Sequence, residues 1–258
     1  MKLAANQPYF FPYIGYYQLI NAVDRFVLYS DIDYIKKGWI NRNRIASKFA
    51  CITDYKYLTV PVRLKMGMKI KDVFISSDCT WASKICKLIL ATYRGCRFFD
   101  EIFPSINSIL TGRDYSYISD LNETIIRNIC ALLDIKTEIV SDIGRYGDLE
   151  KSLSNLQNDG YLNFQSYEKL HLDRKIIRPL EICRMEGADQ YINAIGGKLL
   201  YDKQTFEEYG TEIQFLKTAN IEYDFIGSSF VPNLSIIDVL MMNGIKETKE
   251  LLNQFSLV

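Results

Sequence analysis

The sequence predicts one α/β domain over residues 1–258, with a Rossmann-like, mostly parallel sheet as its core, a β-hairpin insertion and a helical middle section. Three observations support this fold class. The first thirty residues alternate strand, helix and strand patterns, which is the order of a βαβ unit. Residues 57–75 contain two strand-like runs around Met66-Gly67-Met68, which indicates a hairpin. Three helical patterns then follow between residues 81 and 133.

The βαβ unit opens the chain. Lys2–Asn6 is a short apolar strand, Tyr13–Val23 has apolar residues at helical spacing, and Asp24–Tyr29 is rich in β-formers. The two strands are therefore expected to be parallel, with a right-handed crossover. Ligands bind at the carboxyl ends of strands in such sheets. Here those ends carry Gln7-Pro8-Tyr9 and Ser30-Asp31, so we expect these two polar segments to lie together.

The same patterns predict the remaining elements. Helices are expected at Trp81–Tyr93, Phe98–Leu110, Tyr115–Leu133, Leu172–Met185, Tyr201–Glu208, Ser235–Asn243 and Lys246–Phe255, and strands at Thr137–Val140, Gln190–Ile192 and Glu212–Leu216. Pro179 should disturb or restart the helix that contains it. Residues 144–165 are polar and poorly periodic, so we expect a flexible segment there.

Composition excludes several classes of protein. Hydrophobic residues make up 48% and charged residues 24% of the chain, which is typical of globular proteins and not of disordered ones. The 31 basic and 31 acidic residues balance, whereas proteins that bind duplex DNA non-specifically are usually basic. The longest apolar stretch, Tyr9–Ile20, is interrupted by Pro12, Gly15 and Gln18. We therefore expect no DNA partner and no membrane span.

Cysteine and histidine usage argues against a metal site. The six cysteines form no CxxC pair, and His171 is the only histidine, so neither a zinc site nor a Ser-His-Asp or Cys-His arrangement is expected. A lone histidine is more often a satisfied or surface residue than a catalyst. The N-terminus shows no apolar signal segment. We therefore predict a cytoplasmic protein with reduced, mostly buried thiols.

The segment Gln7–Pro12 is the first candidate site. A turn from strand to helix would present the Gln7 amide and the Tyr9 hydroxyl at the top of the sheet. Pro12 suits a helix start, and an exposed helix N-terminus favours a phosphate. The alternative is a packed turn whose aromatic residues only fill the core, and Phe10 and Phe11 are expected there in either case.

The segment Lys37–Arg44 is the second candidate site. It contains two arginines, two asparagines and a lysine within eight residues, which are costly to bury unless they are paired. Guanidinium groups bind diphosphates and carboxylates bidentately, and Trp39 could stack on a base or sugar. The alternative is a structural salt-bridge network with Asp31 or Asp33. Because no acid interrupts the donors, we favour an anionic ligand.

Two further segments have both a structural and a functional interpretation. Ser235 with Asp238 three residues later resembles a capping box, whereas the functional interpretation makes Asp238 a general base or an amine-binding carboxylate. Gly196-Gly197 allows positive φ and close approach of the backbone to a ligand. A plain turn between elements explains the two glycines equally well.

Four long segments carry a family resemblance. They are QPYFFPYIGY at 7–16, GWINRNRI at 38–45, YINAIGGKLLYD at 191–202 and FVPNLSIIDVLM at 230–241. Together they resemble the WbqC-like protein family over nearly the whole chain. Members of that family occur among bacterial genes for O-antigen and other surface polysaccharides. A role in transferring glycine or another aminoacyl or acyl group to an aminosugar has been suggested for them.

The resemblance implies a transferase with two substrates. The acceptor would be a nucleotide-linked aminosugar, and the donor an activated acyl group in carrier-protein, coenzyme A or aminoacyl form. No other cofactor is expected. The chain departs from the family pattern at three places: Ser30-Asp31 replaces two adjacent acids, Asp33 replaces a glutamine before Tyr34, and Tyr223-Asp224-Phe225 replaces Tyr-x-Gln. The substrate or the chemistry can therefore differ here.

These arguments predict one cleft at the carboxyl end of the sheet. Asp31 and Asp238 are the candidate proton-handling residues. The candidate substrate-binding residues are Gln7, Tyr9, Tyr34, Lys37, Trp39, Asn41, Arg42, Asn43, Arg44, Tyr201 and Asn233. If the reaction is aminolysis of an activated acyl group, the incoming amine is the nucleophile, so the protein need not supply one.

Two alternative functions remain open. The strand–turn–helix start loosely resembles that of nucleotidylyltransferases, which would make the protein a nucleotidylyl- or adenylyl-transfer enzyme. The histidines of the HxGH loop that carries that chemistry are missing here. The other alternative is a non-enzymatic partner of a carrier protein or of an assembly.

Overall fold

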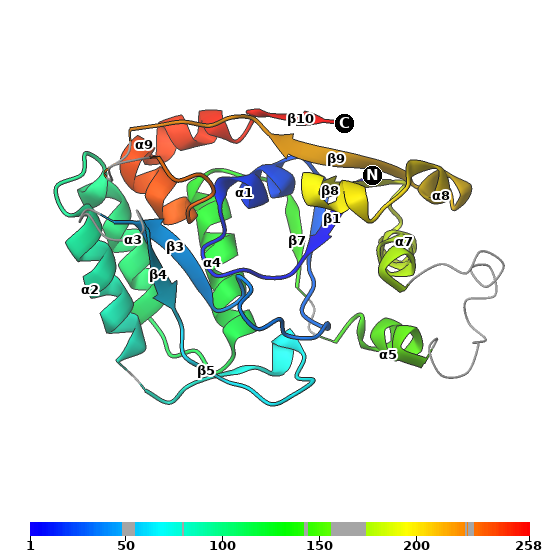
Figure 1. Ribbon diagram of the computed structural model, residues 1–258, viewed down its shortest axis with the longest axis horizontal. Coiled ribbons are helices and arrows are strands. Elements are labelled where there is room, and N and C mark those ends of the chain that lie inside the picture. Colours follow the sequence, from blue (N-terminus) through cyan, green and yellow to red (C-terminus); the bar gives the residue numbers. More distant parts are fainter. Residues whose placement is uncertain (48–54, 79, 142–143, 156–173, 225, 227–229) are drawn as a thin grey trace.

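The computed structural model has the predicted α/β architecture, with a mainly parallel central sheet (Figure 1). It describes residues 1–47, 55–78, 80–141, 144–155, 174–224, 226 and 230–258. His171, Phe225 and two of the six cysteines, Cys51 and Cys79, lie outside the described residues.

The central sheet has six strands in the order β10-β9-β8-β1-β2-β7. Their bounds are β1 Lys2–Asn6, β2 Arg25–Leu28, β7 Glu138–Val140, β8 Gln190–Ala194, β9 Glu212–Thr218 and β10 Phe255–Leu257. The strands β1, β2, β7, β8 and β9 pair with one another in parallel, whereas β10 pairs antiparallel with β9. The predicted βαβ unit is confirmed, because β1 and β2 pair in parallel with Asn6 opposite Leu28.

Eight helices and two short 3-10 helices are found in the described residues. They are α1 Ile14–Asn21, η1 Ile70–Asp72, α2 Trp81–Tyr93, α3 Phe99–Thr111, α4 Ile118–Leu132, α5 Gly147–Asn155, α7 Arg174–Glu186, η2 Ile195–Leu199, α8 Lys203–Glu208 and α9 Ile236–Leu251. The helix predicted over Leu172–Met185 is not broken by its proline: α7 continues through Pro179, which is buried. Packing of that face compensates for the backbone hydrogen bond that proline removes.

The prediction of two C-terminal helices is confirmed at their junction. The element α9, Ile236–Leu251, consists of two helical segments that meet at Gly244, where the backbone is not helical and φ is 71°. A Cβ atom at Gly244 would lie 2.6 Å from the Phe98 ring, so a side chain there is excluded twice, by conformation and by space. The chain after α9 returns to the sheet as β10, which the helical pattern of the tail did not indicate.

The hairpin insertion is real, but its pairing differs from the prediction. The strands β5 (Val62–Arg63) and β6 (Phe74–Ile75) pair over two residues only. The longer ladder joins β4 (Tyr55–Thr59) to β3 (Arg42–Ala46), inside the segment that we expected to be a polar cluster without periodicity. Asn43, Ile45 and Ala46 of β3 are buried while Arg42 and Arg44 are half-buried, so the arginines occupy the outer face of a strand.

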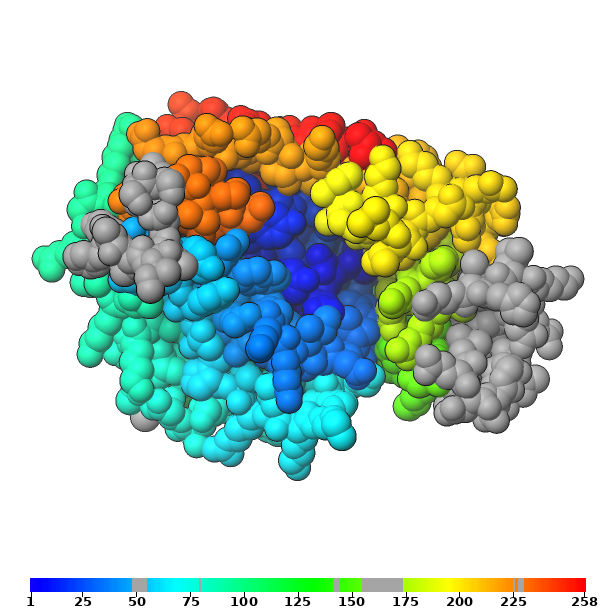
Figure 2. Space-filling view, in the orientation of Figure 1, coloured from blue at the N-terminus to red at the C-terminus, as the bar shows by residue number. Residues whose placement is uncertain are grey.

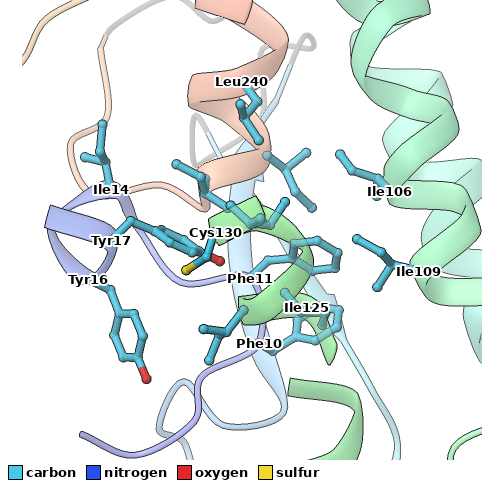
Figure 3. Packing of buried hydrophobic residues seen from close by; sticks show 14 of the residues in the cluster. Phe10, Phe11, Ile14, Tyr16, Tyr17, Ile106, Ile109, Ile125, Cys130 and Leu240 are labelled. Atoms are coloured by element: carbon cyan, nitrogen blue, oxygen red, sulfur yellow. The ribbon is translucent and has the colours of Figure 1, made fainter. Parts of the chain in front are cut away.

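Apolar clusters cover both faces of the sheet, as a parallel sheet requires. One cluster receives Ile14 from α1, Ile125 from α4 and Leu240 from α9, and packs around Phe10 and Phe11 (Figure 3). The other packs against Leu3, Val27 and Tyr191 of the strands and receives residues of α5 and α7. The predicted flexible segment 144–165 contains α5, and residues 156–165 lie outside the described residues.

Burial keeps the described buried thiols protonated and therefore unreactive. Burial raises the pKa of Cys86 to about 11 and that of Cys130 and Cys183 to about 12, so these sulfurs stay protonated near neutral pH. No helix in the described part of the chain is both long and apolar enough to cross a bilayer.

Asn122 of α4 joins the first turn of the chain to the insertion. Its side chain is fully buried, and its Nδ2 donates hydrogen bonds to the carbonyl oxygens of Pro8 at 2.8 Å and Ile40 at 2.7 Å. Both acceptors lie in segments without regular structure of their own. A buried carbonyl without a donor is costly, so this amide fixes the position of the turn that follows β1.

We predict that Asn122→Ala lowers the free energy of unfolding by about 2–4 kcal/mol, because it leaves two buried carbonyl groups without a donor. Asn128→Ala on the same helix is the control. Asn128 is exposed and donates only to the Thr124 carbonyl, so its loss should cost about 0.5 kcal/mol or less. Urea unfolding of both variants measures the difference. Equal destabilisation would contradict the role given to Asn122.

Candidate functional site

A cavity of about 780 Å³ opens at the carboxyl edge of the sheet. It lies over neighbouring strands: its lining includes Tyr9 after β1, Ala194 at the end of β8 and Thr218 at the end of β9. Figure 2 shows the hollow in the middle of the molecule, with the N-terminal residues (dark blue) as its floor and the segments around η2 (yellow) and before α9 (orange) along its rim.

Five of the predicted substrate-binding residues line this cavity: Tyr9, Trp39, Asn43, Arg44 and Asn233. They come from three separate segments of the sequence, which the fold brings to one place. Gly196 also lines it. Neither Gly196 nor Gly197 has positive φ, so the chain does not use the conformational freedom that two glycines allow. Gly197 is needed because a Cβ would lie 2.0 Å from the Asn193 side chain.

The turn after β1 accepts three hydrogen bonds from the side chains of Asn43 and Ser235. The carbonyl of Phe11 accepts hydrogen bonds from Nδ2 of Asn43 at 2.7 Å and from the hydroxyl of Ser235 at 2.8 Å. The carbonyl of Phe10 accepts a second bond from Asn43 at 3.1 Å. Phe11 has a φ of 40°, which is strained for a bulky side chain. These contacts hold the strained backbone, and they fix Tyr9 and Pro12 in the floor of the cavity.

Arg44 lines the cavity in surroundings that differ from those of an ordinary surface arginine. Its guanidinium lies 5.3 Å from the Trp39 ring centre and 4.9 Å from that of Tyr55. One Nη atom is 3.5 Å from the Asn233 carbonyl. Its Nε is buried without a hydrogen-bond partner, and the described residues give it no carboxylate. The guanidinium is therefore positioned by rings and retains donors for an anion.

Most of the remaining polar cluster is used within the protein. Asn41 accepts from the Tyr34 hydroxyl at 2.7 Å and donates to the Val60 carbonyl at 2.9 Å. Arg42 donates to the carbonyls of Gly38 and Lys37 and stacks 4.8 Å from the Tyr57 ring. These four predicted site residues, Tyr34, Lys37, Asn41 and Arg42, are absent from the cavity lining. They shape the loop that carries Trp39.

The acids of the predicted salt-bridge network pair with lysines instead of with Arg42 or Arg44. Asp31 lies 2.6 Å from Nζ of Lys71, and Asp33 lies 2.8 Å from Nζ of Lys69. Asp31 is 3% exposed and follows β2, the neighbour of β1 in the sheet. It is outside the lining of the cavity but at the same edge of the sheet.

Two other predicted site residues, Gln7 and Tyr201, do not line the cavity. Gln7 follows β1 directly and is half-buried, and no hydrogen bond of its side-chain amide is found among the described residues. Tyr201 packs edge-on against Phe206, 5.6 Å between ring centres, with the second apolar cluster. Tyr201 is not part of the lining.

Asp238 is a buried carboxylate and not the second member of a capping box. Ser235 does cap α9, since its hydroxyl accepts from the Ile237 amide at 3.3 Å. The Asp238 side chain is fully buried and accepts hydrogen bonds from the hydroxyls of Tyr93 and Tyr223. Burial raises the pKa of Asp238. Tyr223 lines the cavity, so Asp238 stands directly behind the wall.

Sequence reasoning missed several residues of the cavity. Tyr13, Lys217, Thr218, Tyr223 and Phe230 all line it. The first lies at the start of α1, where only Gln7 and Tyr9 were considered. Lys217 and Thr218 could have been found, because β9 is parallel to β1 and its carboxyl end must reach the same edge. Tyr223 and Phe230 lie in irregular segments whose course no periodicity indicates.

The described residues contain no group of three His, Cys, Asp or Glu side chains that could bind a metal ion. The donors at the cavity are instead a guanidinium, an ammonium, hydroxyls and amides. Such groups hold an organic anion or a sugar by charge-assisted and neutral hydrogen bonds.

We predict that Asp238→Asn changes the pH dependence of stability. The pKa of Asp238 is raised in the folded state. The protonated carboxyl therefore stabilises the wild-type fold fully below about pH 3.8, and this stabilisation is lost as pH rises through the folded-state pKa. The asparagine variant does not titrate there. We therefore expect urea unfolding from pH 4 to pH 8 to show the smallest deficit in the variant's free energy of unfolding, relative to wild type, at the highest pH. A difference that is constant with pH would contradict this prediction.

Two of the three comparisons with known proteins found a match. The chain is 26% identical over 246 residues to a protein of Mycobacterium tuberculosis named Uncharacterized protein Rv1507c, and the match covers 94% of each chain. No solved structure matches the chain significantly. The model of the WbqC-like protein family matches residues 7–250. That range contains the turn after β1, β3, η2 and most of α9, and hence all the segments around the cavity, so this protein belongs to the WbqC-like protein family.

Proposed function

We propose that this protein is a cytoplasmic transferase of bacterial surface-polysaccharide (lipopolysaccharide O-antigen) biosynthesis. It transfers an acyl or aminoacyl group, such as glycyl, to the amine of a nucleotide-linked aminosugar. The observation that carries the proposal is the cavity at the carboxyl edge of the parallel sheet, with Arg44 in its lining and no carboxylate of the described residues bound to that arginine. Family membership supports it.

The position of the cavity supports a small-molecule substrate. Ligands of open α/β sheets bind outside the carboxyl ends of the strands, and ligand pockets commonly measure about 300–1,000 Å³. A cavity of about 780 Å³ at that edge suits a sugar nucleotide. The rings of Tyr9, Tyr13 and Trp39 in its lining give flat apolar surfaces of the kind that pack on sugars and bases.

The proposed reaction is aminolysis. The amine nitrogen forms a bond to the carbonyl carbon of the activated donor, and the bond between that carbon and the leaving group breaks. When the donor is a thioester, the sulfur leaves and ends as a thiol. The proton lost by the amine passes to a carboxylate and from there to the leaving group. Asp31 is the candidate, because it follows β2 at the same edge as the cavity.

Mass spectrometry tests the reaction. The protein is incubated with a uridine-diphosphate aminosugar and with acyl-coenzyme A, acyl carrier protein or aminoacyl donors. The expected result is an amide product whose mass equals that of the aminosugar nucleotide plus the acyl group minus one hydrogen atom. In a parallel incubation with a nucleoside triphosphate and a sugar phosphate, release of pyrophosphate would instead favour nucleotidylyl transfer. Binding of the aminosugar nucleotide without turnover of any donor would contradict the proposed transfer and favour the binding-partner alternative.

We predict that Asp31→Asn lowers turnover about 10²- to 10⁴-fold, the usual effect of removing a general base, while the protein remains folded. Asp33→Asn is the matched control. Asp33 lies two residues away and also pairs with a lysine, at 2.8 Å, but it is exposed, so its loss should leave turnover nearly unchanged. Steady-state rates with thermal unfolding of both variants separate catalysis from stability. Equal turnover in the two variants would remove Asp31 from the mechanism.

A further inference from the structure

The described lining of the cavity is cationic and contains no acid. Arg44 and Lys217 are its charged residues, and no Asp, Glu or His is found among the described residues that line it. Neither cation has an ion-pair partner in the part of the chain that the structure describes. The chain as a whole carries 31 basic and 31 acidic residues, so this local excess of positive charge is not a consequence of composition.

Arg44 has the geometry of an anion ligand. Trp39 and Tyr55 hold its guanidinium at 5.3 and 4.9 Å from their ring centres, which limits its rotation without using its N–H donors. Its buried Nε has no partner, and an unsatisfied buried donor is costly. Among the described residues the Nη atoms make one long contact, at 3.5 Å to the Asn233 carbonyl, so they can bind a phosphate bidentately.

The start of α1 adds to the positive potential of the same wall. Pro12, Tyr13, Ile14 and Gly15 line the cavity, and Tyr13 provides no side-chain cap for the helix. The first N–H groups of a helix lack intrahelical acceptors, and its N-terminus carries a partial positive charge. Gly15 packs so closely that a Cβ would lie 2.7 Å from Oγ1 of Thr218, which joins this helix end to the end of β9.

The cavity also has aromatic surfaces next to its charged groups. Its lining includes the rings of five aromatic residues: Tyr9, Tyr13, Trp39, Tyr223 and Phe230. Tyr223 and Phe230 stack edge to face at 5.1 Å, and the Tyr223 hydroxyl is bound to Asp238 at 2.7 Å. That hydrogen bond fixes the Tyr223 ring in the wall, where it can pack against the flat part of a ligand.

We propose that this cavity binds a nucleoside diphosphate group, with Arg44 and Lys217 on the phosphoanhydride and the aromatic residues around the nucleoside. The inference rests on the proposed function in one respect, because it assigns this cavity to the nucleotide half of the acceptor. The amine of the sugar finds no carboxylate in the described lining, so it lies outside this cavity, toward Asp31 and the carboxyl ends of β1 and β2.

Isothermal titration calorimetry tests the assignment without requiring turnover. The probes are uridine diphosphate, adenosine diphosphate, uridine and inorganic pyrophosphate. Both diphosphates should bind, and uridine should bind at least tenfold more weakly than uridine diphosphate because it lacks the anion. Binding of the diphosphates should weaken as salt increases. Pyrophosphate that binds as tightly as uridine diphosphate would contradict the role given to the aromatic residues.

The variants Arg44→Gln and Lys217→Gln test the two cations. Arg44→Gln should weaken binding of uridine diphosphate about ten- to hundredfold, the effect of losing a charge-assisted hydrogen bond. Lys217 is exposed, so Lys217→Gln should have a smaller effect. Arg97→Gln is the matched control, because Arg97 also stacks on an aromatic ring, at 4.9 Å from Phe98, but lies outside the cavity. Arg44→Lys, which keeps the charge, replaces Arg44→Gln if the latter does not fold.

The outcomes separate this inference from the proposed function. Equal affinities of the Arg44 and Arg97 variants, or no binding of either nucleoside diphosphate to the wild type, would overturn the nucleotide site. Diphosphate binding with the expected variant pattern, but without acyl transfer in the mass-spectrometric assay, would support the site and contradict the transferase.

Discussion

The structure around the cavity depends on how the turn after β1 satisfies its buried carbonyl groups. This turn has no ladder or helix partner of its own, yet its carbonyls at Pro8, Phe10 and Phe11 accept hydrogen bonds from side chains of other elements. The donors are Asn43 of β3, Asn122 of α4 and Ser235 before α9. Buried backbone groups must be paired, so these polar side chains fix where β3, α4 and α9 stand around the turn.

That arrangement determines the chemistry of the carboxyl edge of the sheet. Asn43 binds the turn, and its neighbour Arg44 reaches the cavity beside Trp39. Ser235 binds the turn, and Asp238 one helical turn later holds Tyr223 in the cavity wall. The positive groups thus gather over β1, β8 and β9, whereas the buried acid Asp31 follows β2 and pairs with Lys71. A substrate with an anionic end and an amine end can be oriented by this separation of charge.

The sequence was sufficient for the elements whose periodicity is strong. The βαβ unit, the helix Trp81–Tyr93 and the parallel strands were predictable because apolar spacing reports the buried face. The strand β3 was not, since alternating Asn and Arg residues resemble a polar loop until the partner β4 is known. The site was predictable where a residue follows a strand, as Tyr9 does. The uses of Asn41 and Arg42 were not, because nothing in a sequence tells whether a donor is bound by a ligand or by a backbone carbonyl.

The crystal structure of the protein with a uridine-diphosphate aminosugar tests the central claim most directly. The account predicts the two phosphates in the cavity, with oxygens about 2.7–3.0 Å from the Arg44 guanidinium, and the sugar amine directed toward Asp31. A nucleotide bound elsewhere, with its phosphates away from Arg44 and the start of α1, would contradict the account.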